Sequence, residues 1–287
     1  MHIPSPRARA LTAALGIALA AITAGALAVP AAASDSLPTN PAGDPALMAY
    51  ISSHDTPMGA EIRAHESTSP GPVSPMVTQT PGLDVSGYQG NVNWSTVSAD
   101  GAKFVYIKAT EDTDYTNPYF SQQYDGSYNV GIIRGSYHYA HPNDGTGATQ
   151  AAYFIAHGGG WSSDGKTLPG AIDMEWGTSA QGGDCWGISQ SAMASFITSF
   201  ANYYDSHEGV YPVIYTSTSW WSECVGTAAN YSGNDPLWVA RYASSVGSLP
   251  YNWGFQTIWQ YADSGTFPGD QDYFNGPYSG VQALANG

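Results

Sequence analysis

The chain has 287 residues, of which 23 are Asp or Glu and only 8 are Lys or Arg. This acidic balance argues against nucleic acid as a partner, because binding to phosphates requires clustered basic residues. The length corresponds to one large domain with appended segments or to two small domains.

The first residues predict export. Arg7 and Arg9 precede an apolar run over residues 11–29, and the small residues 31–33 form an A-x-A-like cleavage site. We therefore expect residues 1–33 to be a secretory signal peptide, with a retained membrane anchor as the alternative. The mature protein is then extracellular and has no stable membrane association. In an exported chain, Cys185 and Cys224 are expected to form a disulfide.

Residues 34–81 differ in composition from the chain that follows. They are rich in Pro, Ser, Thr and Gly, and the run over residues 69–75 is the clearest linker. Between residues 45 and 66, sparse apolar side chains allow a short helix. We expect residues 34–81 to be a pro-region or linker, with a spacer to the cell surface and a disordered linker as the alternatives.

From residue 82 onward, short β-rich runs alternate with helical patterns. Strands are predicted at 82–85, 102–108, 131–139, 168–176, 211–216, 237–241, 256–260 and near 272, and helices at 93–97, 117–129, 146–157, 189–207 and 281–284. Alternation of this kind predicts right-handed βαβ units and a parallel sheet. The late connections carry Gly, Ser and Asn rather than long helical patterns. Residues 82–287 are therefore predicted to form an irregular, TIM-like β/α barrel with helices missing in its second half.

A doubly wound open sheet is the competing α/β architecture. It usually carries a glycine-rich phosphate turn after the first strand. Residues 84–90 lack the G-x-G-x-x-G spacing.

Two acids close the fourth predicted strand. Asp173 and Glu175 are two residues apart, so their side chains point to the same face of the strand. Their Cα atoms are then roughly 6–7 Å apart. Glu175, next to the apolar Trp176, is expected to stay protonated and act as a general acid, whereas Asp173 is expected to stay ionised. Other polar and aromatic residues also gather at predicted strand ends, where the mouth of a barrel builds its active site.

Other chemistries leave no signature in this sequence. Neither an HExxH motif nor paired CxxC motifs are present, so we expect no metal and no cofactor. The G-x-S-x-G motif of serine hydrolases is also absent. Lys108, close to Glu111, is interpreted as a buried ion-pair partner rather than a nucleophile.

Several motifs together resemble a known family. They are DVSGYQG at 84–90, YIKATE at 106–111, GSYHY at 135–139, DME at 173–175, Tyr215, and WQY at 259–261. In this order they resemble glycoside hydrolase family 25, the Chalaropsis-type lysozymes or N-acetylmuramidases, in their secreted actinobacterial form. The resemblance implies hydrolysis of the β-1,4 bond between N-acetylmuramic acid and N-acetylglucosamine in bacterial peptidoglycan, by a monomer and with retention of configuration.

The resemblance also implies roles for individual residues. Glu175 is the catalytic acid, Asp173 the second central carboxylate, and Asp84 and Asp272 further acids of the cleft, with Asp270 as the alternative to Asp272. We expect the substrate to be bound by Tyr88, Glu111, Tyr137, His138, Tyr139, Tyr215, Trp238, Trp259 and Tyr261. Either Asp173 attacks the anomeric carbon, or the substrate's 2-acetamido oxygen does so while Asp173 stabilises the resulting oxazolinium ion; we favour the second. The competing functions are a chitinase-like glycosidase and a non-catalytic wall-binding module.

Overall fold

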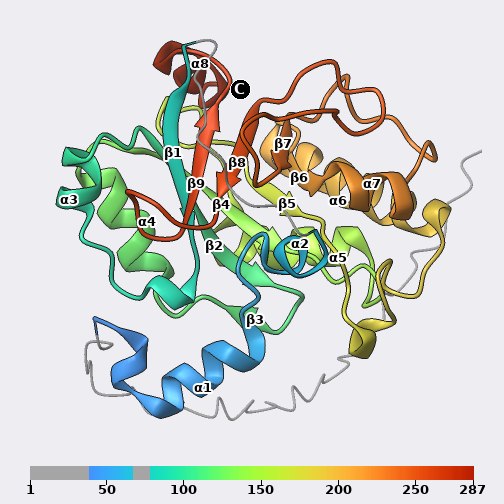
Figure 1. Ribbon diagram of the computed structural model, residues 1–287, viewed down its shortest axis with the longest axis horizontal. Coiled ribbons are helices and arrows are strands. Elements are labelled where there is room, and N and C mark those ends of the chain that lie inside the picture. The colour runs from blue at the N-terminus through green and yellow to red at the C-terminus, as the bar shows by residue number, and fades with distance from the viewer. Residues whose placement is uncertain (1–38, 67–77) are drawn as a thin grey trace, which may run out of the picture. The chain divides into compact units, whose positions relative to one another are not determined.

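Eight β-strands close into a barrel in the computed structural model, which describes residues 39–66 and 78–287 (Figure 1). The predicted signal peptide and the run at 69–75 lie outside the described residues. The barrel strands are β1 (Thr80–Val85), β2 (Phe104–Glu111), β4 (Ile133–Tyr139), β5 (Ala171–Asp173), β6 (Val213–Ser217), β7 (Leu237–Ala240), β8 (Ile258–Ala262) and β9 (Asp270–Phe274). Pairing of β1 with β2 closes the ring, and the short β3 (Tyr115–Thr116) pairs with the end of β2. The barrel predicted from the sequence is thus confirmed, and the open sheet is wrong.

The last barrel strand runs against its neighbours. β9 is antiparallel to both β8 and β1, whereas the other neighbouring barrel strands are parallel. The sequence had predicted a parallel sheet throughout. The reason for the difference is that a parallel connection needs a crossover of a dozen or more residues, and residues 263–269 are too few. The N-terminal end of β9 therefore lies at the same mouth as the C-terminal ends of the parallel strands.

Helices cover the outside of the barrel unevenly. They are α3 (Trp94–Ala99), α4 (Phe120–Asn129), α5 (Gly147–Phe154) with a π-helical turn (Ile155–Gly159), α6 (Gln190–Glu208), α7 (Thr218–Cys224) and α8 (Tyr278–Leu284). The helix predicted at 189–207 is confirmed as α6, and its apolar side chains Met193, Phe196, Ile197, Phe200 and Tyr204 are all buried. The short α7, capped by Ser217, was not predicted, and the β7–β8 connection has no helix.

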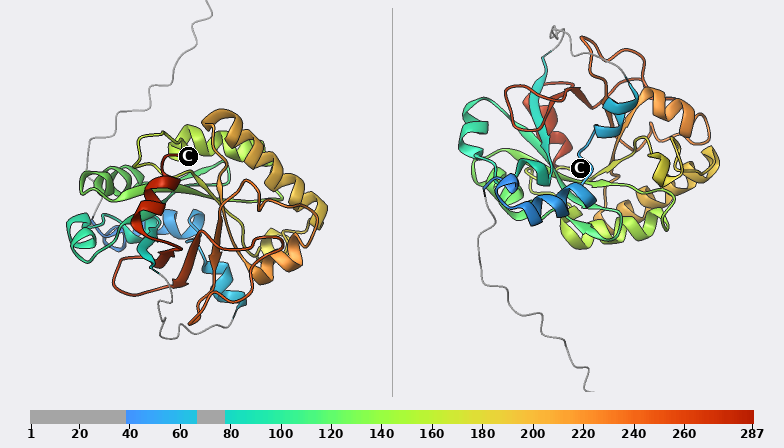
Figure 2. Two further views of the ribbon diagram at one scale, coloured as in Figure 1. Left: turned by 90° about the horizontal axis from the view of Figure 1, so that it is seen from above. Right: turned by 60° about the horizontal axis from the view of Figure 1, so that its bottom comes forward.

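The segment at residues 39–66 packs in the same compact unit as the barrel. It contains a 3₁₀ turn (Pro41–Gly43), α1 (Pro45–His54) and α2 (Ala60–His65), drawn in blue in Figures 1 and 2. Asp44 caps α1 by accepting from the N–H groups of the next turn, and Pro45 occupies the first helical position. Two helices therefore form where the sequence allowed one. No helix within residues 39–66 and 78–287 is long and apolar enough to span a membrane.

Candidate active site

Four carboxylates expected at the mouth lie inside the barrel. Asp84, Asp173, Glu175 and Asp272 are exposed by only 3, 1, 2 and 0 %. They come from β1, the end of β5 and the chain just beyond it, and β9. Buried carboxylates are rare unless they are paired or functional. Their convergence from different strands therefore marks this interior as the candidate active site.

Asp84 is held by a polar network that the sequence did not point out. Gln260 Nε2 donates to Asp84 Oδ2 at 2.8 Å, while Gln260 Oε1 accepts from the hydroxyls of Tyr215 and Tyr242 at 2.6 and 2.5 Å. Burial, followed by the charges of Asp270 and Asp272, raises the pKa of Asp84 well above its ordinary value. Gln260 thus fixes Asp84 in place and joins it to two phenols.

Asp272 and Asp270 have different surroundings. Asp272 accepts from Trp238 Nε1 at 3.0 Å, and burial raises its pKa well above the ordinary range. Asp270 lies opposite Asp84 at the mouth and pairs with Arg63 Nη1 at 2.8 Å. Because β9 is antiparallel, Asp272 is the deeper of the two acids. Asp272 is therefore the one placed among the aromatic side chains of the interior.

Glu175 is hydrogen-bonded by residues far away in the sequence. Its Oε1 accepts from the N–H of Gly59 at 2.7 Å, and its Oε2 accepts from the N–H groups of Glu61 and Ile62 at 2.8 and 3.0 Å. These donors lie at the first turn of α2, where helical N–H groups have no partner within the helix. Among the described residues, no N–H group donates to either oxygen of Asp173.

These contacts set the order in which the two acids ionise. Burial raises the pKa of Glu175 to about 7, while the N–H donors and the positive charge of Arg63 lower it. Burial, and then the neighbouring Glu175, raises the pKa of Asp173 well above its ordinary value. N–H donors favour the ionised form of an acid, so this arrangement stabilises charge on Glu175 rather than on Asp173. The sequence had led us to expect the opposite.

A buried lysine links the same segment to the barrel. Lys108 Nζ contacts Asp55 Oδ1 at 2.9 Å, Glu111 Oε2 at 2.5 Å and the carbonyl of Thr56 at 2.6 Å. Burial lowers the pKa of Lys108, but the two carboxylates raise it by more, so that the overall shift is upward. The interpretation of Lys108 as an ion-pair partner of Glu111 is confirmed.

Comparison with known proteins identifies the family. The family model described as "Glycosyl hydrolases family 25" matches residues 83–270. The chain belongs to glycosyl hydrolase family 25. The N,O-diacetylmuramidase of Chalaropsis sp is 47 % identical over 210 residues, which cover 72 % of this chain and 99 % of the relative. Lysozyme M1 of Streptomyces globisporus is 41 % identical over 239 residues, covering 80 % of this chain and 81 % of the relative. The solved family GH25 lysozyme from Aspergillus fumigatus superposes with a TM-score of 0.71 at 42 % identity, covering 73 % of this chain and all of that one.

The interior of this glycoside hydrolase contains about half of the aromatic residues expected to bind substrate. Trp238 packs against Tyr215, with ring centroids 5.1 Å apart, and reaches Asp272 through its indole N–H. The hydroxyl of Tyr137 lies 3.4 Å from the N–H of Met58, and the Tyr139 ring lies 4.9 Å from Lys108 Nζ. Tyr88 is half-buried in the 3₁₀ turn Gly87–Gln89 after β1.

Three other expected substrate residues face away from the interior of the hydrolase. His138 alternates with Tyr137 and Tyr139, so it points outward. It bonds to Thr110 and to Gln150 of α5, and its ring packs on those of Phe154 and Phe200. Trp259 lies on the opposite side of β8 from Gln260, and Tyr261 stacks on Tyr273 at 4.4 Å. The physical reason is strand alternation, which sends successive side chains to opposite faces. The sequence motif grouped these residues with the inward-facing ones, whereas Gln260 and Tyr242 were missed.

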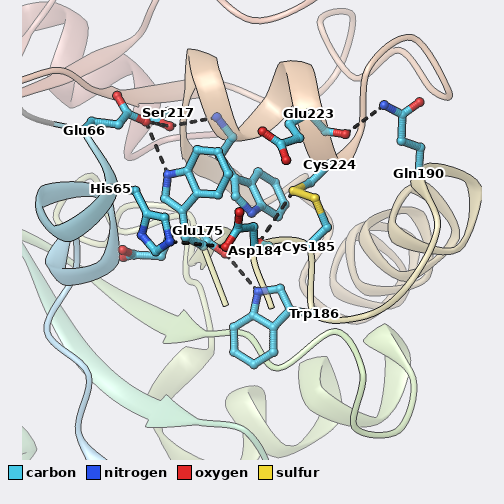
Figure 3. Close-up of a disulfide and its surroundings, with 12 residues drawn as sticks. His65, Glu66, Glu175, Asp184, Cys185, Trp186, Gln190, Ser217, Glu223 and Cys224 are labelled. Atoms are coloured by element: carbon cyan, nitrogen blue, oxygen red, sulfur yellow. Dashed lines mark hydrogen bonds and ion pairs between the residues drawn. A yellow bond between two sulfur atoms is a disulfide. The ribbon is translucent and has the colours of Figure 1, made fainter. Parts of the chain in front are cut away.

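The predicted disulfide between Cys185 and Cys224 is confirmed, with Cα atoms 5.2 Å apart (Figure 3). It ties α7 to the loop that carries Trp186. The indole N–H of Trp186 donates to the backbone carbonyl of Glu175 at 2.9 Å. In this family-25 hydrolase, the disulfide therefore supports the loop beside the central acid.

Proposed function

We propose that this chain is a secreted N-acetylmuramidase that cleaves the β-1,4 bond between N-acetylmuramic acid and N-acetylglucosamine in bacterial peptidoglycan. The observation that carries the proposal is the pair Asp173 and Glu175, buried together at the end of β5 in a family-25 barrel. Relatives that are 47 and 41 % identical carry the names N,O-diacetylmuramidase and lysozyme. The enzyme acts as a monomer on glycan strands outside the cell.

Glu175 is the proton donor to the glycosidic oxygen. A carboxyl group that must give up a proton near neutral pH needs a raised pKa, and burial provides this for Glu175. Asp84 and Asp272 are the further acids of the cleft, placed to interact with the sugar ring, where positive charge develops in the transition state.

Asp173 orients the substrate's own 2-acetamido group. In this mechanism, the acetamido oxygen attacks the anomeric carbon while Glu175 protonates the leaving oxygen, and Asp173 stabilises the positively charged oxazolinium ion. Water then opens that ring with overall retention. A thiazoline analogue of the oxazolinium ion is expected to inhibit, whereas a glycosyl ester trapped on Asp173 would refute this version in favour of direct attack.

The test measures the release of soluble reducing sugar from purified peptidoglycan, with chitin as the control substrate. It is run on the intact chain and on the chain cleaved between residues 66 and 78. Glu175→Gln is expected to lower the activity by about 10²–10⁴-fold, because it removes the proton donor. Glu223→Gln, the same substitution on the exposed face of α7, is the matched control. Activity on chitin alone, or on neither substrate in either form, would refute the proposal.

A further inference from the structure

The segment over residues 39–66 lies over the carboxylates that would have to meet the substrate. Figure 2 shows its two helices beside the barrel, and the contacts place α2 at the mouth. Asp173 and Glu175 are 1 and 2 % exposed with this segment in place. A glycan strand is a polymer, and its scissile bond must reach Glu175 directly. The arrangement described by the structure leaves no room for that contact.

The segment occupies the hydrogen-bonding positions of Glu175 itself. Three N–H groups, those of Gly59, Glu61 and Ile62, donate to its two oxygens at 2.7 to 3.0 Å. A carboxyl group that must donate a proton to a substrate cannot do so while both oxygens accept from backbone N–H groups. The donors also stabilise the ionised form of Glu175, which is the form that cannot act as an acid.

Anchors on both sides of Glu175 hold the segment across the mouth. On one side, Asp55 reaches Lys108, and Thr56 donates to Glu111 through its N–H at 2.7 Å. On the other side, Arg63 pairs with Asp270 at 2.8 Å.

The end of α2 adds further contacts. His65 stacks on Trp176 with ring centroids 4.9 Å apart. Glu66 accepts from Ser217 at 2.5 Å (Figure 3). The segment thus contacts the ends of β2, β5 and β6 and the start of β9.

The fit is closest at Gly59. Its φ of +76° lies in the left-handed region, and a Cβ added there would lie 2.0 Å from the hydroxyl of Tyr242 and 2.8 Å from that of Tyr215. Only glycine allows the backbone to approach the network of Gln260 so closely. The complementarity therefore involves the same side chains that hold Asp84.

The segment also has the properties of a removable part. It lies outside the family match, which begins at residue 83. Its buried apolar side chains Met58 and Ile62 belong to the main hydrophobic core of the barrel rather than forming a core of their own. Helices of ten and six residues are not stable alone in water, so the segment loses its structure when it leaves the barrel.

We infer that residues 39–66 form an inhibitory pro-segment that blocks the active site in cis, and that cleavage of the chain between residues 66 and 78 releases the active enzyme. This inference rests on the proposed function. According to this inference, a segment of the chain itself occupies the active site, and proteolysis activates the enzyme. While the segment is covalently attached, its effective concentration at the mouth is on the order of millimolar. After cleavage, it is diluted into the surroundings.

The test uses the full secreted chain with a recognition sequence for a sequence-specific protease in place of residues 69–75. Activity on peptidoglycan is measured at nanomolar enzyme before and after cleavage. We expect an increase of ~100-fold or more, because cleavage lowers the concentration of the segment from about millimolar to nanomolar. The cleaved enzyme should lose activity again when a synthetic peptide of residues 39–66 is added.

Two substitutions test the contacts in the uncleaved chain. Gly59→Ala and Arg63→Ala should each raise the activity of the intact chain by ~10-fold or more. A tenfold change in the occupancy of the active site by the segment corresponds to about 1.4 kcal/mol. The matched control is Gly101→Ala, because Gly101 also has a positive φ, of +106°, but a Cβ there meets nothing within 4 Å. It should leave the intact chain inactive. Circular dichroism checks that each variant keeps the barrel fold.

The outcomes separate the inference from the proposed function. Equal activity of the intact and the segment-free chain would overturn the inference and leave the muramidase assignment in place. Activity that is lost with the segment, while the barrel stays folded, would make the segment part of the working site and would also overturn it. A folded barrel that is inactive on peptidoglycan both with and without the segment would refute the proposed function instead.

Discussion

The ion pair between Lys108 and Asp55 gives the most quantitative prediction. The Lys108 side chain is 0 % exposed. Its ammonium donates to Glu111 Oε2 and to the carbonyl of Thr56, and it forms an ion pair with Asp55 Oδ1 at 2.9 Å. Lys108→Met keeps the volume of the side chain but leaves two buried carboxylates without their counter-charge.

Removal of one partner from a buried pair costs roughly 3–5 kcal/mol, so Lys108→Met should lower the free energy of unfolding by about that amount at pH 7. Asp55→Asn in the same chain removes one of the two uncompensated charges. The double variant should therefore be more stable than the sum of the two single effects predicts, with a coupling of about 1–3 kcal/mol.

The pH dependence gives an independent check. Lys108 and His141 hold the pKa of Glu111 at about 2, below its value in the unfolded chain, although burial acts in the opposite direction. The stabilisation from Glu111 is therefore present above roughly pH 4 and is lost as the pH falls toward 2. Lys108→Met lacks most of this stabilisation, so the difference between the wild type and the variant should shrink over that window.

Urea unfolding followed by tryptophan fluorescence measures these quantities, and equal m-values show that the same surface is exposed in each variant. A loss below about 1 kcal/mol, which is the range of exposed pairs, would contradict the assignment of Lys108 to a buried pair. So would strict additivity of Asp55→Asn and Lys108→Met, since residues in one network are expected to couple.

Three further predictions concern the rest of the molecule. Replacing both Cys185 and Cys224 by Ser should cost about 4 kcal/mol in urea unfolding, because the disulfide spans a sequence separation of 39; an unchanged midpoint would contradict this. Burial, and then a neighbouring aspartate, raises the pKa of Asp235 to about 8, so the stability falls as the pH rises from about 4 toward 8. Asp235→Asn should remove that slope and stabilise the fold at pH 7.5 by on the order of 3 kcal/mol, as thermal unfolding across this range would show. Asp272→Asn should lower the activity of the cleaved enzyme by about 10²-fold by removing a carboxyl group beside the sugar. Asp270→Asn should instead raise the activity of the uncleaved enzyme by weakening the ion pair with Arg63 of the segment. The opposite pattern would exchange the roles of these two acids.

From residue 82 onward, the sequence alone was sufficient for most of the strands and helices and for most of the acids. Strand and helix patterns from residue 82 onward are local, and a barrel brings the ends of its parallel strands to one mouth. For that reason Asp84, Asp173 and Glu175 could be grouped before any coordinates were known. The chain has only two cysteines, so in an exported protein they could form only one disulfide, and this pairing could also be predicted.

Only the tertiary structure decided which side chains face the site. His138 and Trp259 belong to the same motifs as Tyr137 and Gln260, but they lie on the other face of their strands. The direction of β9 depends on a short connection, and it placed Asp272 deeper than Asp270. None of these choices changes the local hydrophobic pattern, so none could be read from it.

The segment at residues 39–66 was the least predictable part. Its composition is that of a linker, with few apolar residues and weak periodicity. Its order comes from partners that are far away in the sequence, chiefly the carboxylate of Glu175, which accepts from the N–H groups of Gly59, Glu61 and Ile62. Backbone N–H groups are present in nearly every residue and carry no sequence signal. Hydrogen bonds from backbone N–H groups can be recognised only in the folded structure, where the barrel brings the acceptor carboxylate next to them.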